Sequence, residues 1–242
     1  MITPKDIERK TMSPEKRKEA SKSIWGFYIG RPITYVLTIP FLYTNISPNT
    51  VTYISLIFSV LGLCFLSFGN SMVYQLLGLF FIFMWSMYDG VDGNIARYKN
   101  QKSEGGDILD TLGGYMSMAF VFLAMGNATL SSRNIWNMQI GQITNIGVFL
   151  GGVSATLTLI PRLLMHRKIA NSKDKSGAEK LKEKEDYSLA KIVALNLCDP
   201  AGFQEIIMLV CIILGRFSEF TLFYFVFNLA VAIYSIRSLV RN

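Results

Sequence analysis

The chain has 242 residues, of which 51% are hydrophobic and only 17% are charged, and its mean hydropathy is +0.34. Soluble domains carry about 25% charged residues, so this composition excludes an ordinary soluble protein and indicates a polytopic membrane protein. A net charge of +7 is compatible with nucleic-acid binding, but the Lys and Arg residues lie in segments that flank apolar spans. We therefore expect the lipid bilayer and phosphorylated substrates as partners, and no nucleic acid.

The first 46 residues form the first of two predicted domains, a cytoplasmic helix followed by an interfacial segment. Ser13 and Pro14 suit the N-cap and the first position of a helix. Residues 24–44 combine six aromatic side chains with one arginine and two prolines. We expect this stretch to lie along the membrane surface, partly helical and with breaks at Pro32 and Pro40; a short first transmembrane helix is the alternative.

Six apolar segments follow the sequence Ser47-Pro48-Asn49 and make up the second predicted domain, residues 47–242. They are separated by polar or charged stretches and lie at about 50–68, 72–97, 106–126, 140–164, 200–215 and 220–236. The expected fold is therefore all-α, a membrane bundle of six transmembrane helices.

The fifth apolar segment is unusually short. Its uncharged run, residues 206–215, cannot cross about 30 Å of hydrocarbon at about 1.5 Å per residue. Extended back to Pro200, with Asp199 as N-cap, it has about sixteen residues and includes Glu205. A glutamate inside a span faces protein or a water-filled cavity, so Glu205 has two possible roles, a helix–helix hydrogen bond or an active-site group.

The distribution of basic residues predicts the orientation of the spans. With the N-terminus inside, 22 of the 24 Lys and Arg residues fall on the cytoplasmic side, which is a strong positive-inside pattern. Both termini are then cytoplasmic. Arg162, near the end of the fourth segment, would reach the same surface as the charged stretch described next.

A dense group of charges lies between the second and third apolar segments. No Lys, Arg, Asp or Glu occurs between residues 32 and 88, and eight then occur within the 22 residues 89–110. Asp89 and Asp92 are three residues apart, as are Asp107 and Asp110, so each pair shares one face of a helix. An antiparallel hairpin joined by the loop 98–106 would bring the two acidic faces together.

Clustered carboxylates repel one another unless a cation lies between them, and oxygen ligands of this kind favour Mg²⁺, Mn²⁺ or Ca²⁺ over Zn²⁺. Glycines in the same stretch allow a ligand to approach the backbone, while Arg97 and the nearby lysines can bind phosphate. The spacing of an EF-hand loop is absent. The residues therefore predict a divalent-metal site for a phosphorylated substrate.

The same stretch resembles the signature of the CDP-alcohol phosphotransferases, also called CDP-alcohol phosphatidyltransferases. That signature is D-x-x-D-G-x-x-A-R, eight residues, then G-x-x-x-D-x-x-x-D. Seven of its eight fixed positions match here at the right spacing, at Asp89, Asp92, Gly93, Ala96, Arg97, Gly106 and Asp110. The resemblance implies Mg²⁺ or Mn²⁺ held by Asp89, Asp92 and Asp110, and a CDP moiety surrounded by Gly93, Ala96, Arg97 and Gly106. Arg162 is a candidate ligand for a phosphate or for the acceptor, from its position alone.

The eighth signature position departs from the family. Its last aspartate, the general base that the resemblance implies, falls on Gly114. Asp107, one turn before Asp110, and Glu205 are the candidate replacements. Activation of the acceptor hydroxyl by the metal alone, and an inactive chain, are the other possibilities.

Three functions of different classes follow from these observations. The first is a membrane transferase that moves a phospho-alcohol group from a CDP-linked donor, by default CDP-diacylglycerol, to an acceptor alcohol and releases CMP; a water-soluble CDP-alcohol is the alternative donor. The second is a catalytically impaired homologue that retains the nucleotide site. The third is a small transporter. The sequence argues against it, because it shows no discontinuous spans in two matching halves. The resemblance also implies a possible homodimer.

Overall fold

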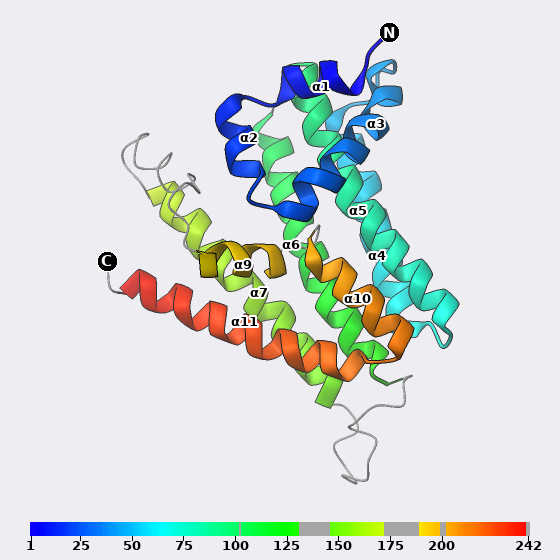
Figure 1. The fold of residues 1–242 in the computed structure, drawn as a ribbon, viewed down its shortest axis with the longest axis vertical. Helices are drawn as coiled ribbons and strands as arrows, with labels where there is room; N and C mark the ends of the chain where they lie inside the picture. Colours follow the sequence, from blue (N-terminus) through cyan, green and yellow to red (C-terminus); the bar gives the residue numbers. More distant parts are fainter. Residues whose placement is uncertain (102, 131–145, 172–188, 199–201, 241–242) are drawn as a thin grey trace. The chain divides into compact units, whose positions relative to one another are not determined.

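A computed structural model describes residues 1–101, 103–130, 146–171, 189–198 and 202–240 (Figure 1). Its described residues form helices and no strand, so the expected all-α class is confirmed. The chain forms two compact units. The first comprises residues 1–61, 79–117 and 187–206, and the second comprises residues 62–78, 118–186 and 207–242.

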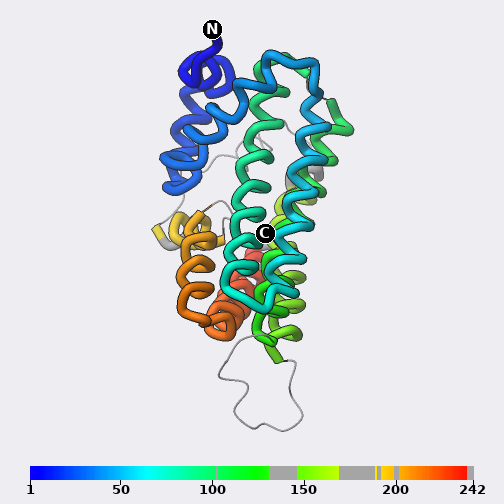
Figure 2. The backbone as a smooth tube through the Cα atoms, turned by 90° about the vertical axis from the view of Figure 1, so that its right-hand side faces the viewer, coloured from blue at the N-terminus to red at the C-terminus, as the bar shows by residue number. Residues whose placement is uncertain are grey.

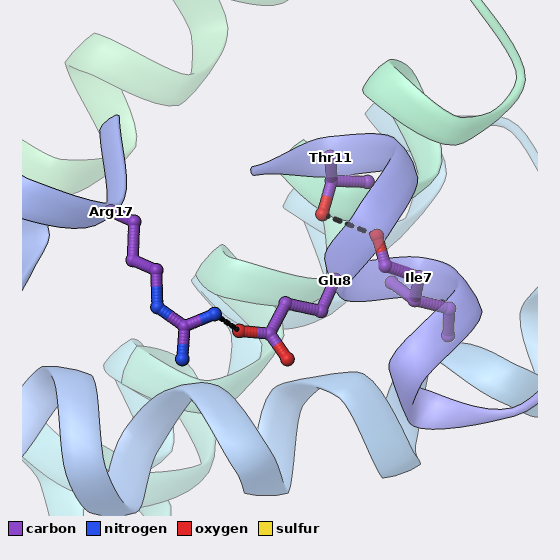
Figure 3. Close-up of polar contacts among 4 residues, drawn as sticks. All are labelled: Ile7, Glu8, Thr11 and Arg17. Carbon is purple, nitrogen blue, oxygen red and sulfur yellow. Dashed lines mark hydrogen bonds and ion pairs between the residues drawn. The ribbon is translucent and has the colours of Figure 1, made fainter. Parts of the chain in front are cut away.

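The first unit begins with two short helices, α1 (Pro4–Thr11) and α2 (Pro14–Ala20). Ser13 caps α2 as expected, since its hydroxyl accepts a hydrogen bond from Lys16 N–H. An ion pair of 2.8 Å between Arg17 and Glu8 joins the two helices (Figure 3). This pair is exposed and contributes little to stability; the fully buried side chain of Ile7 anchors α1 more firmly.

A reciprocal capping box begins α1. The Asp6 N–H donates to the Thr3 hydroxyl oxygen, and the Asp6 carboxylate accepts from the Thr3 hydroxyl and the Thr3 N–H. These hydrogen bonds favour the ionised form, and they lower the pKa of Asp6 below its usual 3.8.

The expected interfacial segment is more continuous than its prolines predict. A π-helical turn, η1 (Gly26–Gly30), runs directly into α3 (Arg31–Leu42), so the predicted break at Pro32 is wrong. The wider π-helical turn, in which Arg31 N–H donates to Gly26 C=O, gives the proline ring room inside the helix. The predicted break at Pro40 is also wrong, and α3 continues to Leu42.

Three long helices follow: α4 (Pro48–Phe68), α5 (Met72–Tyr98) and α6 (Glu104–Ala128). A tight turn at residues 69–71 joins α4 and α5 as an antiparallel hairpin (Figure 2). Within the first unit, α4 contributes Val51 and α5 contributes Val91 and Ile95 to a fully buried apolar cluster. Side chains of α3 pack against this cluster, which fixes α3 beside the charged end of α5.

The second unit contains α7 (Ile146–Asn171) and α11 (Phe217–Val240), which pack along each other (Figure 1). Gly126 of α6 and Gly151 of α7 meet closely, because a Cβ built at Gly151 would lie 2.8 Å from the Gly126 Cα. Small residues on both helices permit this close approach, and no larger residue fits at this crossing.

Five described helices are long and apolar enough to cross a membrane: α4, α5, α6, α7 and α11. A sixth candidate is the bent pair of Ile192–Cys198, within α9 (Leu189–Cys198), and α10 (Phe203–Leu214). The polytopic architecture agrees with the expected six spans. The predicted N-cap at Asp199 lies outside the described residues, and Glu205 lies in the first turn of α10.

Candidate active site

The turn between α5 and α6 places the two halves of the charged stretch side by side. Its backbone is a Schellman motif, in which Gln101 N–H donates to Ala96 C=O and Asn100 takes the left-handed conformation, with φ of 54°. Asparagine tolerates this conformation better than most residues other than glycine. The helix α5 ends at Tyr98 and α6 begins at Glu104, so the helices extend further into the predicted loop 98–106 than expected.

A pocket of about 500 Å³ opens at this end of the first unit. It gathers three segments: the start of α4, the end of α5 with the following turn, and the start of α6. Its wall contains Pro48, Asn49, Thr52, Asp92, Gly93, Ala96, Arg97, Gln101, Ser103, Glu104, Gly106, Asp107 and Asp110. The antiparallel hairpin thus brings together most of the residues that the sequence singles out.

The acidic side of the pocket is built around Asp92. Its side chain is buried, and one carboxylate oxygen accepts a 2.6 Å hydrogen bond from the Thr52 hydroxyl on α4. The Asp110 charge lies near enough to repel that of Asp92, and Asp110 in turn lies near Asp107. The Asp89 side chain lies near enough to interact with that of Asp110. Carboxyl oxygens from two helices therefore converge on one region.

These carboxylates have the right chemistry for a hard divalent cation. Asp89, Asp92 and Asp110 supply only oxygen, which suits Mg²⁺ or Mn²⁺. Within the described part of the chain, however, no three His, Cys, Asp or Glu side chains meet closely enough to form a ready metal-binding group. The donor set fits the ion, and rotation of the carboxylates about their side-chain bonds would be needed to complete the shell.

The basic side of the pocket is the Arg97 guanidinium, which lies over Gly93. A Cβ at Gly93 would stand 3.0 Å from both terminal nitrogens of Arg97, so glycine makes room for that side chain. One terminal nitrogen donates to the Asn94 side-chain oxygen at 3.2 Å. The Arg97 Nε is buried and has no hydrogen-bond partner among the residues that the structure describes. An unsatisfied charged donor on a pocket wall fits an anionic ligand such as phosphate.

Lys99 does not add to this basic side as expected. Lys99 points to the end of α3, where its ammonium donates to the carbonyls of Phe41, at 3.2 Å, and Thr44, at 2.7 Å. It is therefore a helix C-cap rather than a phosphate ligand. Lys102 lies outside the described residues.

Two wall residues from α4 are missing from the prediction, Asn49 and Thr52. The Asn49 side-chain oxygen lies beside Gly106, at 2.8 Å from a Cβ built there. The two are three residues apart in the first turn of α4, so they share a face. Their spacing just after Ser47-Pro48 is the sequence feature that could have indicated them as site residues. An uncharged pair in an apolar helix, however, does not distinguish a binding site from ordinary packing.

Two predicted site residues lie elsewhere. Glu205 is buried and accepts a 3.0 Å hydrogen bond from Ser86 on α5, so the helix–helix contact expected as one alternative is present. Glu205 is not part of the pocket wall. Arg162 lies on α7 in the second unit. Because α7 continues to Asn171, Arg162 is further from the helix end than predicted.

Gly114 faces open space. It is four residues after Asp110 on α6, and a Cβ built there meets no atom within 4 Å. Its neighbour Gly113 is packed, with a Cβ position 3.1 Å from Leu56. Glycine at 114 is therefore not required by packing within the chain, and a side chain at this position could extend freely.

Residues 45–234 match the model of the CDP-alcohol phosphatidyltransferase family. This range includes every wall residue of the pocket and excludes α1, α2 and α3. A comparison with curated proteins finds no match.

Proposed function

Because the chain belongs to the CDP-alcohol phosphatidyltransferase family, we propose that it moves a phospho-alcohol group from a CDP-linked donor to the hydroxyl of an acceptor alcohol. The acceptor oxygen forms a bond to the donor phosphorus, the bond from that phosphorus to the CMP phosphate breaks, and CMP leaves. The observation that carries this proposal is a single pocket whose wall combines Asp92, Asp107 and Asp110 with Arg97.

The carboxylates and the arginine have complementary roles in this proposal. Asp89, Asp92 and Asp110 would hold Mg²⁺ or Mn²⁺, which when bound neutralises charge on the diphosphate and on the departing phosphate. Arg97 binds a phosphate through its unsatisfied Nε and its outer nitrogens. The small residues Gly93, Ala96 and Gly106 leave the wall open to the nucleotide; they line the pocket together with Asn49 and Thr52.

Asp107 is the best-supported candidate for the general base. It lines the pocket, its side chain is exposed, and it lies one turn before Asp110 on the same face of α6. Glu205 has a hydrogen-bond partner on α5 and is outside the pocket wall, so it ranks below Asp107. Arg162 stays a candidate for a phosphate of donor or acceptor.

The default donor is CDP-diacylglycerol, which would place the reaction at a membrane surface in phospholipid synthesis; a water-soluble CDP-alcohol is the alternative. The asymmetry of basic residues supports a cytoplasmic pocket and cytoplasmic termini. A homodimer is part of the same family expectation. The open position at Gly114 favours one rival, an impaired homologue that binds the nucleotide without turnover.

The test is CMP release by the purified full-length protein from CDP-diacylglycerol, with Mg²⁺ or Mn²⁺, against a panel of acceptor alcohols. We expect metal-dependent release with one acceptor, and its loss in Asp92→Asn and Asp110→Asn. Wild-type turnover in either variant would contradict the metal assignment. CDP binding without CMP release from any lipid or water-soluble donor would favour the impaired homologue. The absence of both CDP binding and CMP release would exclude the proposed function.

A further inference from the structure

Asn94 connects the N-terminal helix α3 with the Arg97 guanidinium. Its side chain is 2% exposed. The amide nitrogen donates to the Thr38 hydroxyl at 3.2 Å and to the Thr34 hydroxyl at 3.5 Å, both on α3. The amide oxygen accepts from an outer nitrogen of Arg97 at 3.2 Å. Asn94 occupies an unspecified position of the family signature, between Gly93 and Ala96.

The hydrogens available fix which way this amide points. The Thr34 hydroxyl donates its one hydrogen to Arg31 C=O at 2.9 Å, and the Thr38 hydroxyl donates its hydrogen to Thr34 C=O at 2.6 Å. Both hydroxyls can therefore only accept from Asn94. The NH₂ group must face α3 and the oxygen must face Arg97, which can only donate. These donors and acceptors are therefore compatible with only one orientation of the Asn94 amide.

The contact with α3 is rigid as well as polar. Thr34 presses its methyl group against Gly90, where a Cβ would come within 2.7 Å of that methyl. On the other side, the outer nitrogens of Arg97 rest on Gly93. The Arg97 Nε makes no hydrogen bond with any described residue, so the hydrogen bond that Asn94 accepts from an outer nitrogen orients the guanidinium toward the pocket.

We propose that Asn94 is a positioning residue that transmits the placement of α3 to Arg97, so that α3 forms part of the phosphate-binding apparatus although it precedes the matched family region. The inference rests on the proposed function in one respect, the role of Arg97 in binding phosphate. It assigns no contact between Asn94 and substrate. Removing Asn94 should impair recognition of phosphate while leaving the nucleoside portion of the site unchanged.

The experiment measures binding of two probes to the full-length protein by calorimetry, CDP and cytidine, which lacks phosphate. For Asn94→Ala we expect CDP to bind about tenfold more weakly, as for a lost hydrogen bond to a charged group, with cytidine binding unchanged. Adding Asn94→Ala to Arg97→Ala should weaken CDP binding no further, since Asn94 acts through Arg97. A change confined to folding would lower both affinities and would add to the effect of Arg97→Ala.

A second variant keeps the test decisive if Asn94→Ala does not fold. Thr38→Val removes an Asn94 partner without touching Arg97, and it should weaken CDP binding severalfold with cytidine unaffected. Its control is Thr156→Val, because the Thr156 hydroxyl is exposed and donates to Gly152 C=O of its own helix. Unchanged CDP affinity in Thr38→Val or a soluble Asn94→Ala would overturn this inference alone; absence of CDP binding by the wild type would overturn it together with the proposed function.

Discussion

Gly93→Ala should separate ligand binding from stability. The new Cβ would lie 3.0 Å from both outer nitrogens of Arg97 and 3.3 Å from its Cζ, whereas non-bonded heavy atoms separate to about 3.5 Å or more. The guanidinium must therefore move by about 0.5 Å. Its hydrogen bond to Asn94 is already 3.2 Å long and would stretch beyond the useful range.

The size of the effect follows from that displacement. Losing a hydrogen bond that involves a charged group costs about 1.5–3 kcal/mol, so CDP affinity should fall about tenfold or more. Alanine is at the same time favoured over glycine inside a helix by about 1 kcal/mol. Because this gain offsets part of the cost of the lost hydrogen bond, we expect Gly93→Ala to lower thermal stability only slightly while CMP release falls clearly at low donor concentration.

The assay compares CMP-release kinetics and thermal unfolding of Gly93→Ala with those of Gly152→Ala. Gly152 is also inside a helix, and a Cβ there meets nothing within 4 Å, so this control receives the helix gain without the clash. Wild-type donor affinity in Gly93→Ala would refute the argument, as would an equal loss in Gly152→Ala.

Three further predictions concern supporting contacts. Thr52→Val removes the 2.6 Å hydrogen bond to Asp92 and should weaken Mn²⁺ binding about 10-fold or more, as measured by electron paramagnetic resonance. Unchanged Mn²⁺ affinity would contradict the assignment of Asp92 as a metal ligand supported by Thr52. Lys99→Met leaves the end of α3 uncapped and should lower the unfolding temperature while cytidine affinity is retained, so a selective loss of cytidine binding would contradict a purely capping role. Because the pKa of Asp6 is lowered in the folded protein, its ionised carboxylate stabilises α1 at pH values above the usual carboxyl pKa of 3.8. This stabilisation should be lost as the pH falls through the lower pKa of the folded state, which would appear as faster amide exchange in α1. In Asp6→Asn, amide exchange in α1 should show no such acceleration at acid pH.

The charge pattern predicted which residues lie together because it is local in sequence. Asp92 and Asp110 belong to helices that are consecutive in the chain, so the spacing within each helix nearly determines the arrangement. Contributions from distant helices could not be predicted in this way. Thr52 and Asn94 are uncharged, and their importance depends on neighbours from other helices: Asp92 of α5 for Thr52, and Thr38 of α3 for Asn94.

The errors have physical causes of the same kind. Pro32 favours a helix break by its local chemistry, but the preceding π-helical turn accommodates its ring. Lys99 has the charge of a phosphate ligand, but its ammonium instead donates hydrogen bonds to the carbonyls at the end of α3. In both cases tertiary structure decided between options that the residue type left open.

The open space at Gly114 makes the identity of the base testable by moving the carboxylate. Asp107 and position 114 flank Asp110 on one face of α6, one turn to either side. If Asp107 is the base, Asp107→Asn should lower CMP release by about 10²-fold or more. Adding Gly114→Asp should then restore part of that loss, whereas Gly114→Asn, which has the same shape and cannot accept the proton, should restore none. Both side chains fit, since nothing lies within 4 Å. A hundredfold gain from Gly114→Asp alone would instead mean that the native chain lacks an effective base and that Asp107 does not replace it.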